Sequence, residues 1–184
     1  MSSTFTIRPA SAADLPEIQA IYAHHVMHGA GSFEEAPPSL EEVEARFADV
    51  VEHGWSWLVA ADATGVLGYA YFKRYHERTG YRYTAENSIY VRDDVRGQGV
   101  GKALVARLLE DAERAGFRQM LAVIGDSENV GSIGVHTSLG FRQVGLLRSV
   151  GLKFGSWVDI VLMQRALGRG DAAVPSDDAS PRAS

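Results

Sequence analysis

Hydrophobic residues in the N-terminal part of the chain recur every three to four positions, the period of an amphipathic helix. One stripe begins at Leu15, behind the capping residue Ser11, and predicts a helix that runs to about His28. A second stripe follows the capping box at Ser39 and predicts another helix. A short alternating run at Phe5–Ile7 precedes both and predicts a first strand.

Farther along the chain the period changes to two, which is typical of strands. Alternation over Trp55–Val59 and Val66–Phe72, with a turn at Asp62–Gly65 between them, predicts a hairpin. A third strand is predicted at about Glu86–Arg92. A polar, aromatic-rich loop from Lys73 to Thr84 is expected to lead into it.

The C-terminal half mixes helices and strands. A helix is predicted from Val100 to Ala115, and a buried strand follows at Met120–Ile124. Because a helix separates this strand from the one at Glu86–Arg92, the two are expected to be parallel neighbours. The rest of the pattern is a short helix over Asn129–Leu139 and two final strands, Phe141–Leu147 and Val158–Met163, joined through Gly151–Gly155.

This order of elements predicts a single α/β domain over residues 1–167, with a mixed central β-sheet flanked by helices. From Gly168 onward the composition becomes Gly, Asp, Ala, Pro and Ser without an aromatic residue. Residues 168–184 are therefore predicted to form a disordered C-terminal tail.

Composition narrows the possible functions. The chain has 184 residues, a formal charge of −5 and no cysteine. The acidity argues against a nucleic-acid partner, and the lack of cysteine excludes disulfides, thiolate zinc sites and a cysteine nucleophile. No leader-like or membrane-spanning run is visible, so no membrane partner and a cytoplasmic location are expected. His24 and His28 have metal-ligand spacing, but no further ligand stands nearby, and no metal site is predicted.

A glycine-rich stretch, Arg96–Gly101, lies between the predicted strand and the helix that begins at Val100. A tight turn there can aim backbone N–H groups outward beside a helix N-terminus, which suits phosphate groups. A P-loop would need Gly at position 96 and Ser or Thr at 103, where the chain has Arg96 and Ala103. A dinucleotide fingerprint would need Gly at position 102, which is Lys102. A glycine-rich turn without a ligand is the alternative.

The remaining pattern, Arg-x-x-Gly-x-Gly, resembles the coenzyme A pyrophosphate loop of the GNAT superfamily of N-acetyltransferases, and the element order matches that superfamily over roughly residues 4–165. The segment from Asn129 to Phe141 resembles the second cofactor segment, with His136 where the superfamily commonly has tyrosine. The motifs at Gly80–Val91 and Lys153–Asp159 are similar to those of phosphinothricin N-acetyltransferases and methionine sulfoximine acetyltransferases.

The resemblance implies an acetyl-CoA-dependent N-acetyltransferase that acts on the amino group of a small amino-acid-like substrate, without a metal and usually as a homodimer. A substrate amine is mostly protonated at neutral pH, so a base must remove a proton before the nitrogen attacks. Glu86 holds the general-base position of the resemblance. For His136 three roles stay open: an acid that protonates the departing thiolate, a second base, or a structural histidine at the end of its helix.

Binding residues also follow from the resemblance. The amides of Ile89, Tyr90 and Val91, with Asn129, would contact the pantetheine arm and acetyl group, and Arg96, Gly97, Gln98, Gly99, Val100 and Gly101 would surround the pyrophosphate. Phe33, Arg78, Gly80 and Tyr81 would face the acceptor. Arg78 suits a carboxylate or phosphinate because guanidinium presents paired donors, although a solvated loop arginine is the alternative.

Two other functions remain to be separated from this expectation. One is acetylation of a different amine, such as a polyamine or a protein N-terminus; arginines in the Arg78–Arg82 loop disfavour a cationic acceptor. The other is a non-catalytic acyl-CoA-binding module that regulates a partner. Binding alone requires neither a carboxylate at Glu86 nor a titratable group at His136, so these two residues favour an enzyme.

Overall fold

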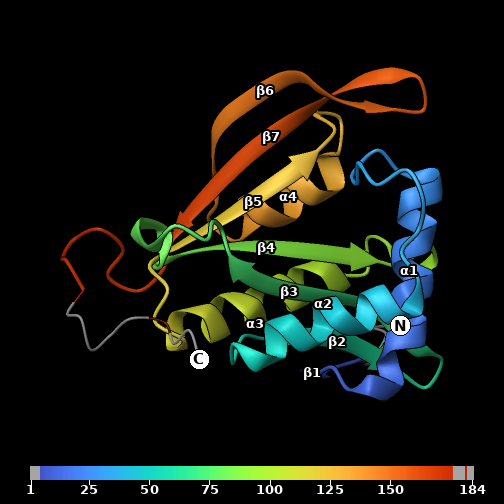
Figure 1. Cartoon of the computed structure of the whole chain (residues 1–184), viewed down its shortest axis with the longest axis horizontal. Coiled ribbons are helices and arrows are strands. Elements are labelled where there is room, and N and C mark those ends of the chain that lie inside the picture. The colour runs from blue at the N-terminus through green and yellow to red at the C-terminus, as the bar shows by residue number, and fades with distance from the viewer. Residues whose placement is uncertain (1–4, 176–180, 182–184) are drawn as a thin grey trace.

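The structure, a computed structural model, describes residues 5–175 and residue 181 (Figure 1). Its strands are β1 (Thr6–Pro9), β2 (Trp57–Asp62), β3 (Gly65–Arg74), β4 (Thr84–Val91), β5 (Gln119–Gly125), β6 (Arg142–Lys153) and β7 (Ser156–Ala166). Its α-helices are α1 (Leu15–His28), α2 (Leu40–Glu52), α3 (Val100–Arg114) and α4 (Val130–Ser138). Short 3-10 helices are η1 (Ala12–Asp14), η2 (Thr79–Tyr81) and η3 (Asp93–Val95).

The strands form one sheet in the order β1-β2-β3-β4-β5-β7-β6. β4 and β5 pair in parallel, whereas the other neighbours pair antiparallel. This confirms the predicted mixed sheet and the predicted parallel pair on either side of the glycine loop. The parallel pair requires a crossover, which α3 supplies.

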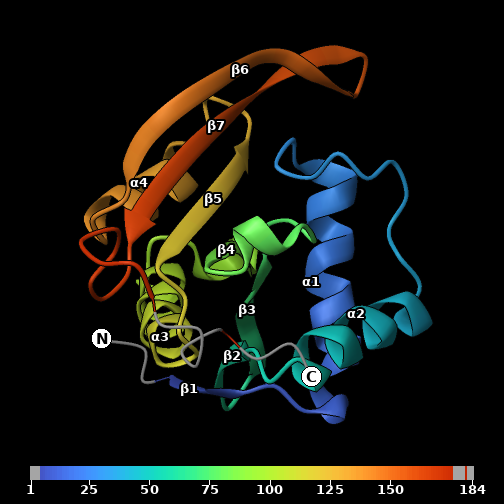
Figure 2. The same ribbon diagram turned by 60° about the vertical axis from the view of Figure 1, so that its left-hand side comes forward.

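Helices cover both faces of the sheet. Figure 2 shows α3 and α4 on one side and α1 and α2 on the other. Four consecutive residues of β2, Trp57–Ala60, are buried because helices lie on both sides of that strand. The capping box predicted at Ser39 is present: its side chain accepts from Glu42 N, and the Glu42 side chain accepts from Ser39 N.

Two connecting segments predicted from the sequence are shortened because the neighbouring strands extend into them. β3 extends through Arg74, opposite Ala85, so the loop before β4 is shorter than the one predicted from Lys73 to Thr84. β6 extends to Lys153, through the segment predicted to be a connection. Its pairing with β7 shifts register twice, and Ser149 has a φ of 54°, so two bulges interrupt the alternation that would have revealed the strand.

The C-terminal segment continues past β7 as a series of turns. Leu167 is buried, and Gly170 N donates to its carbonyl at 2.8 Å. Residues 176–180 and 182–184 of the predicted disordered tail lie outside the described residues, and Pro181 is buried. None of the helices in the described ranges has the length and hydrophobicity of a membrane-crossing segment.

Candidate active site

The two parallel strands separate near the middle of the sheet. Their ladder runs from Thr84 opposite Gln119 to Asn87 opposite Ala122, although β4 continues to Val91 and β5 to Gly125 (Figure 1). Backbone groups on this edge of β4 beyond Asn87 therefore have no ladder partner on β5. Ile89, Tyr90 and Val91, expected to contact the cofactor, lie on this segment of β4, which pairs with β3 on its other edge.

The glycine loop that follows β4 leaves its backbone uncovered. Gly97 and Gly99 have φ angles of 77° and 83°, and a Cβ added at either position would meet no atom within 4 Å. Gly99 is the N-cap of α3, so the N–H groups of Val100 and Gly101 in the first turn lack helical acceptors. Gln98 differs, because its N–H lies 3.4 Å from the Val95 carbonyl. Open amides at a helix N-terminus fit a pyrophosphate.

Arg96, at the start of this loop, is linked to α1 through the carboxylate of Asp93. Arg96 forms an ion pair with Asp93 at 2.5 Å, and His24 Nε2 lies 2.7 Å from the other oxygen of the same carboxylate. The pKa of the Asp93 carboxyl group is lowered mainly by the hydrogen bond with His24, whereas burial raises that pKa. His24 thus bonds to the loop preceding α3 and, at 4.7 Å between ring centroids, also packs on His28.

Glu86 is half-buried on β4, one residue before the strands separate. Burial raises the pKa of its carboxyl group, and the charge of Lys73 works in the opposite direction. Side chains two positions apart share one face of a strand, and Tyr90 on the Glu86 face packs against Tyr22 of α1. Glu86 therefore points toward the side covered by α1 and α2.

His136 lies on the other side. It is 1% exposed, and its ring contacts Asn87, whose side chain points away from Glu86. Burial lowers the pKa of His136, and a hydrogen bond with the Ser132 carbonyl works against this effect. Because Glu86 and His136 lie on opposite faces of β4, the geometry favours separate roles over a shared base.

Asn129 caps α4. Its Oδ1 accepts from Ser132 N at 3.2 Å, while Nδ2 lies 3.5 Å from the Gly125 carbonyl at the end of β5. The side chain is therefore bonded to α4 and to the end of β5, and its predicted contact with the pantetheine arm stays a prediction.

The loop between α1 and α2 packs closely on the ends of β5 and β6. A Cβ at Gly151 would lie 2.4–2.7 Å from the ring of Phe33, and a Cβ at Gly125 would lie 2.9 Å from the carbonyls of Ala30 and Gly31. Only glycine permits these approaches. Phe33 is thus held against the β6–β7 hairpin, beside the C-terminal end of β5.

Glu34 anchors the same loop from three directions. Its carboxylate accepts hydrogen bonds from Tyr22 of α1 at 2.9 Å and from Arg46 of α2 at 2.8 Å. Its backbone carbonyl accepts from Nζ of Lys153, a side chain that is only 5% exposed. The sequence does not predict these contacts, although Lys153 belongs to one of the motifs similar to those of phosphinothricin N-acetyltransferases.

The predicted acceptor-binding residues are not brought together within one chain. Arg78, Gly80 and Tyr81 are exposed in the loop that precedes β4. The loop between α1 and α2, which carries Phe33, lies at the other end of β4 (Figure 1). The eight residues of β4 span about 23 Å between these two regions. Tyr81 packs on Tyr75, with ring centroids 5.6 Å apart, within its own loop.

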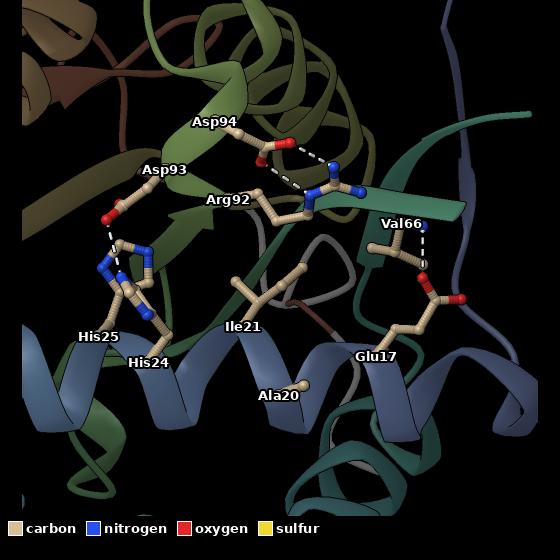
Figure 3. Close-up of a pocket in the computed structure, with 9 residues that line it drawn as sticks. All are labelled: Glu17, Ala20, Ile21, His24, His25, Val66, Arg92, Asp93 and Asp94. Carbon is tan, nitrogen blue, oxygen red and sulfur yellow. Dashed lines mark hydrogen bonds and ion pairs between the residues drawn. The ribbon is translucent and has the colours of Figure 1, made fainter. Parts of the chain in front are cut away.

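A separate cavity of about 400 Å³ lies between α1 and the segment that follows β4 (Figure 3). Its charged groups pair with neighbours: His24 with Asp93, and Arg92 with Asp94. Glu17 accepts from a backbone N–H at 2.8 Å. The cavity is lined by Glu17, Ala20, Ile21, His24, His25, Val66, Arg92, Asp93 and Asp94, so it includes neither Glu86 nor the glycine loop.

Comparisons with known proteins identify the family of the chain. A family model described as an acetyltransferase (GNAT) domain matches residues 4–142. The phosphinothricin N-acetyltransferase of Alcaligenes faecalis is 49% identical over 170 residues, which are 92% of this chain and 86% of the relative. The L-methionine sulfoximine/L-methionine sulfone acetyltransferase of Pseudomonas aeruginosa is 44% identical over 160 residues, 86% of this chain and 92% of the relative.

A solved structure extends the similarity to the whole fold. The crystal structure of a GNAT superfamily phosphinothricin acetyltransferase from Sinorhizobium meliloti, in complex with AcCoA, matches with a TM-score of 0.92 and 42% identity, covering 100% of both chains. The chain therefore belongs to the GNAT superfamily and is an N-acetyltransferase.

Proposed function

We propose that the protein transfers the acetyl group of acetyl-CoA to the α-amino group of amino acids of the phosphinothricin and methionine sulfoximine type. The names of its relatives support this acceptor class. The observation that carries the mechanism is Glu86, a half-buried carboxylate whose pKa burial raises, placed where β4 and β5 separate. None of the described residues donates a hydrogen bond to this carboxylate.

Glu86 removes one proton from the substrate ammonium, directly or through a water molecule, and its raised pKa makes it a stronger base for this step. The freed nitrogen lone pair attacks the thioester carbonyl and forms a tetrahedral intermediate in which the nitrogen carries two hydrogens and a positive charge. The nitrogen loses one of these protons as the carbon–sulfur bond breaks, so that a neutral amide remains, and the departing thiolate takes up a proton. Backbone N–H groups on the unpaired edge of β4 are suited to bond the carbonyl oxygen as it becomes negative.

Cofactor binding relies on the loop from Arg96 to Gly101. The uncovered backbone of Gly97 and Gly99 and the N-terminus of α3 support a pyrophosphate site. Asn129 and the Ile89–Val91 backbone approach the pantetheine arm from the two separated strands. Acetyl-CoA enters as a co-substrate, and the chemistry needs no metal.

Arg78 favours an anionic acceptor. It is exposed, and in the described part of the chain its guanidinium has no carboxylate partner. A free guanidinium would attract a carboxylate or phosphinate and repel a polyamine. Acetylation of a polyamine or a protein N-terminus is therefore the less favoured alternative.

A homodimer would bring Arg78 of one subunit toward Phe33 of another. The β6–β7 hairpin supports this assembly because it exposes several large apolar side chains, unusual for a surface left in water. These side chains are Leu147, Val150, Leu152, Phe154 and Trp157. We infer a cytoplasmic location from the use of acetyl-CoA, with no nucleic-acid or membrane partner.

The decisive experiment is a thiol-release assay with acetyl-CoA and a panel of amines: phosphinothricin, methionine sulfoximine, methionine sulfone, proteinogenic amino acids, spermidine and a peptide with a free N-terminus. The first three are expected to have the highest kcat/KM. A preference for spermidine or the peptide would overturn the acceptor assignment. Coenzyme binding without turnover of any amine would instead favour the regulatory module.

The dimer is tested by mixing two impaired variants. If each site takes Phe33 from one subunit and Arg78 from the other, a mixed dimer of Phe33→Ala and Arg78→Ala contains one intact site. Activity should then rise after subunits exchange, to as much as half of the parent rate in the mixed dimer. Light scattering that shows a monomer, or mixtures no more active than their components, would refute the shared site.

A further inference from the structure

Asn87 occupies the point at which β4 and β5 separate. It is the last β4 residue paired with β5, opposite Ala122, and its side chain is 6% exposed. Its Nδ2 donates a hydrogen bond to the backbone carbonyl of Leu121 on β5, at 3.0 Å. This bond braces the junction from which the two strands diverge.

The other end of the Asn87 amide meets a buried imidazole. Its Oδ1 lies 3.0 Å from Nε2 of His136. On the opposite side of the ring, Nδ1 lies 2.8 Å from the Ser132 carbonyl, and the Ser132 hydroxyl is a more distant neighbour at 3.5 Å. Phe141 packs edge-on against the ring, with centroids 4.8 Å apart. One asparagine thus connects β4, β5 and α4.

The protons of this cluster can be counted. The Ser132 carbonyl can only accept, so Nδ1 carries the proton of a neutral His136 ring. Nε2 then offers a lone pair, but it faces the acceptor end of the Asn87 amide. In one arrangement Nε2 takes up a proton, the second of the ring, and donates it to Oδ1 of Asn87. In the other, the Asn87 amide turns over and places its oxygen against the Leu121 carbonyl. Only the first arrangement keeps the hydrogen bond from Asn87 to the Leu121 carbonyl of β5.

Charged side chains do not decide between these arrangements. The recorded contacts of the ring within the described residues are Ser132 from α4, Asn87 from β4 and Phe141 ahead of β6, and none is charged. Glu86 adjoins Asn87 in the chain but points to the opposite face of the strand. The Asn87 amide is therefore the side chain that controls how readily His136 accepts its second proton.

We propose that Asn87 is a positioning residue for His136. It holds the ring with Nδ1–H turned toward α4 and Nε2 turned toward the β4–β5 junction, and it sets the pH range in which Nε2 is protonated. A protonated Nε2 at this junction can supply the proton that the departing thiolate takes up. This kinetic consequence rests on the proposed acetyl transfer, whereas the arrangement of the ring does not.

Nitrogen-15 NMR of histidine-labelled protein tests the arrangement without turnover. Nδ1 of His136 should be protonated throughout, and His136→Gln identifies the signal by its loss. Asn87→Asp should raise the pKa of His136 by about one to two pH units, because a carboxylate favours imidazolium. Asn87→Leu should lower it by about one unit, because the charged ring loses its acceptor. His25, bonded to the Val91 carbonyl on the other face, is an internal reference that should not move.

Asn87→Ser replaces Asn87→Leu if the latter does not fold, since serine is too short to reach both partners and should also lower the pKa of His136. Equal pKa values in the Asp and the Leu or Ser variants, or an unprotonated Nδ1 in the parent, would overturn the proposal.

Kinetics with phosphinothricin test the consequence. In the pH profile of kcat, the alkaline limb should move to higher pH in Asn87→Asp and to lower pH in Asn87→Leu or Asn87→Ser. The Kd of acetyl-CoA should stay unchanged within about threefold. If the pKa of His136 measured by NMR changes and the alkaline limb of kcat does not, His136 does not supply the proton to the thiolate, and that part of the proposal is wrong. If the parent acetylates none of the amines, the acceptor proposal fails while the NMR result still decides the role of Asn87.

Discussion

Lys73 of β3 lies directly opposite Glu86 of β4 in the antiparallel ladder. Burial raises the pKa of Glu86, and the positive charge of Lys73 lowers it. The lysine therefore keeps the carboxylate available as a base at lower pH than burial alone would allow. The pair balances two requirements of a general base, which must be basic enough to take a proton and yet be ionised when the substrate arrives.

Removing this lysine should shift the pH dependence of catalysis. Without Lys73 the pKa of Glu86 rises, so the acid limb of the kcat/KM profile should move upward by about half a pH unit in Lys73→Met, a modest effect because Lys73 is exposed. Lys73→Arg keeps the charge and is the matched control. A profile that is the same in Lys73→Met and the parent would mean that the limb does not report Glu86.

Glu86→Gln should separate catalysis from stability. Loss of a general base should lower kcat by roughly 10²- to 10⁴-fold with little change in the Kd of acetyl-CoA. The folded pKa lies above the unfolded one, so ionisation of Glu86 costs stability as pH rises through that interval. Glu86→Gln should therefore raise Tm at pH 8 by about 1–3 °C and change it little at pH 4. Turnover within about threefold of the parent would exclude Glu86 as the base.

Gly99→Val should weaken cofactor binding more than it weakens the fold. A β-branched residue is strained at the φ of 83°, and its side chain would cover the amides at the start of α3. The Kd of acetyl-CoA, measured by calorimetry, should rise at least tenfold, on the order of the loss of one or two charge-assisted hydrogen bonds. Gly54→Val is the matched control, because Gly54 has a similar φ of 72° and equally open surroundings. Equal Kd values in both variants would move the phosphate site elsewhere.

Gly151→Ala should impair the use of the amino-acid acceptor. The new methyl group would lie within 2.7 Å of the Phe33 ring, so the loop between α1 and α2 must shift. A displacement of this size near a reacting group should lower kcat/KM for the amino acid about 10- to 100-fold while the Kd of acetyl-CoA stays constant. Gly145→Ala on the same strand is the control, since its Cβ would lie 3.4 Å from Leu162, an ordinary contact. An unaltered kcat/KM in Gly151→Ala would show that the position of Phe33 is unimportant.

Local signals predicted the elements that local interactions determine. The capping residues at Ser11 and Ser39 marked the helices, and the glycines around Gly99 marked the turn before α3. The parallel pairing of β4 and β5 followed from the helix between them. In contrast, the length of β6 was hidden because two bulges break its alternation.

The contacts that organise the site were not visible in the sequence because they join distant segments. Asn87 and His136 are 49 positions apart, and the backbone of Glu34 meets Lys153 across 119 positions. No local period relates such residues. The separation of Phe33 from Arg78 likewise emerged only once the direction of β4 was known, since both residues resembled acceptor contacts in the sequence.

The last prediction concerns what the acceptor must carry. If Arg78 binds an anionic group beside the reacting amine, blocking the carboxylate of phosphinothricin as an amide should cost roughly 10- to 150-fold in kcat/KM, the contribution of one charge-assisted hydrogen bond. Arg78→Ala should lose activity on the free acid and leave the amide nearly unaffected. Measuring both substrates with both enzymes completes a double-mutant-style cycle, and Arg82→Ala in the same loop is the control. Because Arg82 already donates to the Thr79 carbonyl and packs over Tyr83, it should not discriminate between acid and amide. Equal losses on acid and amide in Arg78→Ala would mean that Arg78 only shapes its loop.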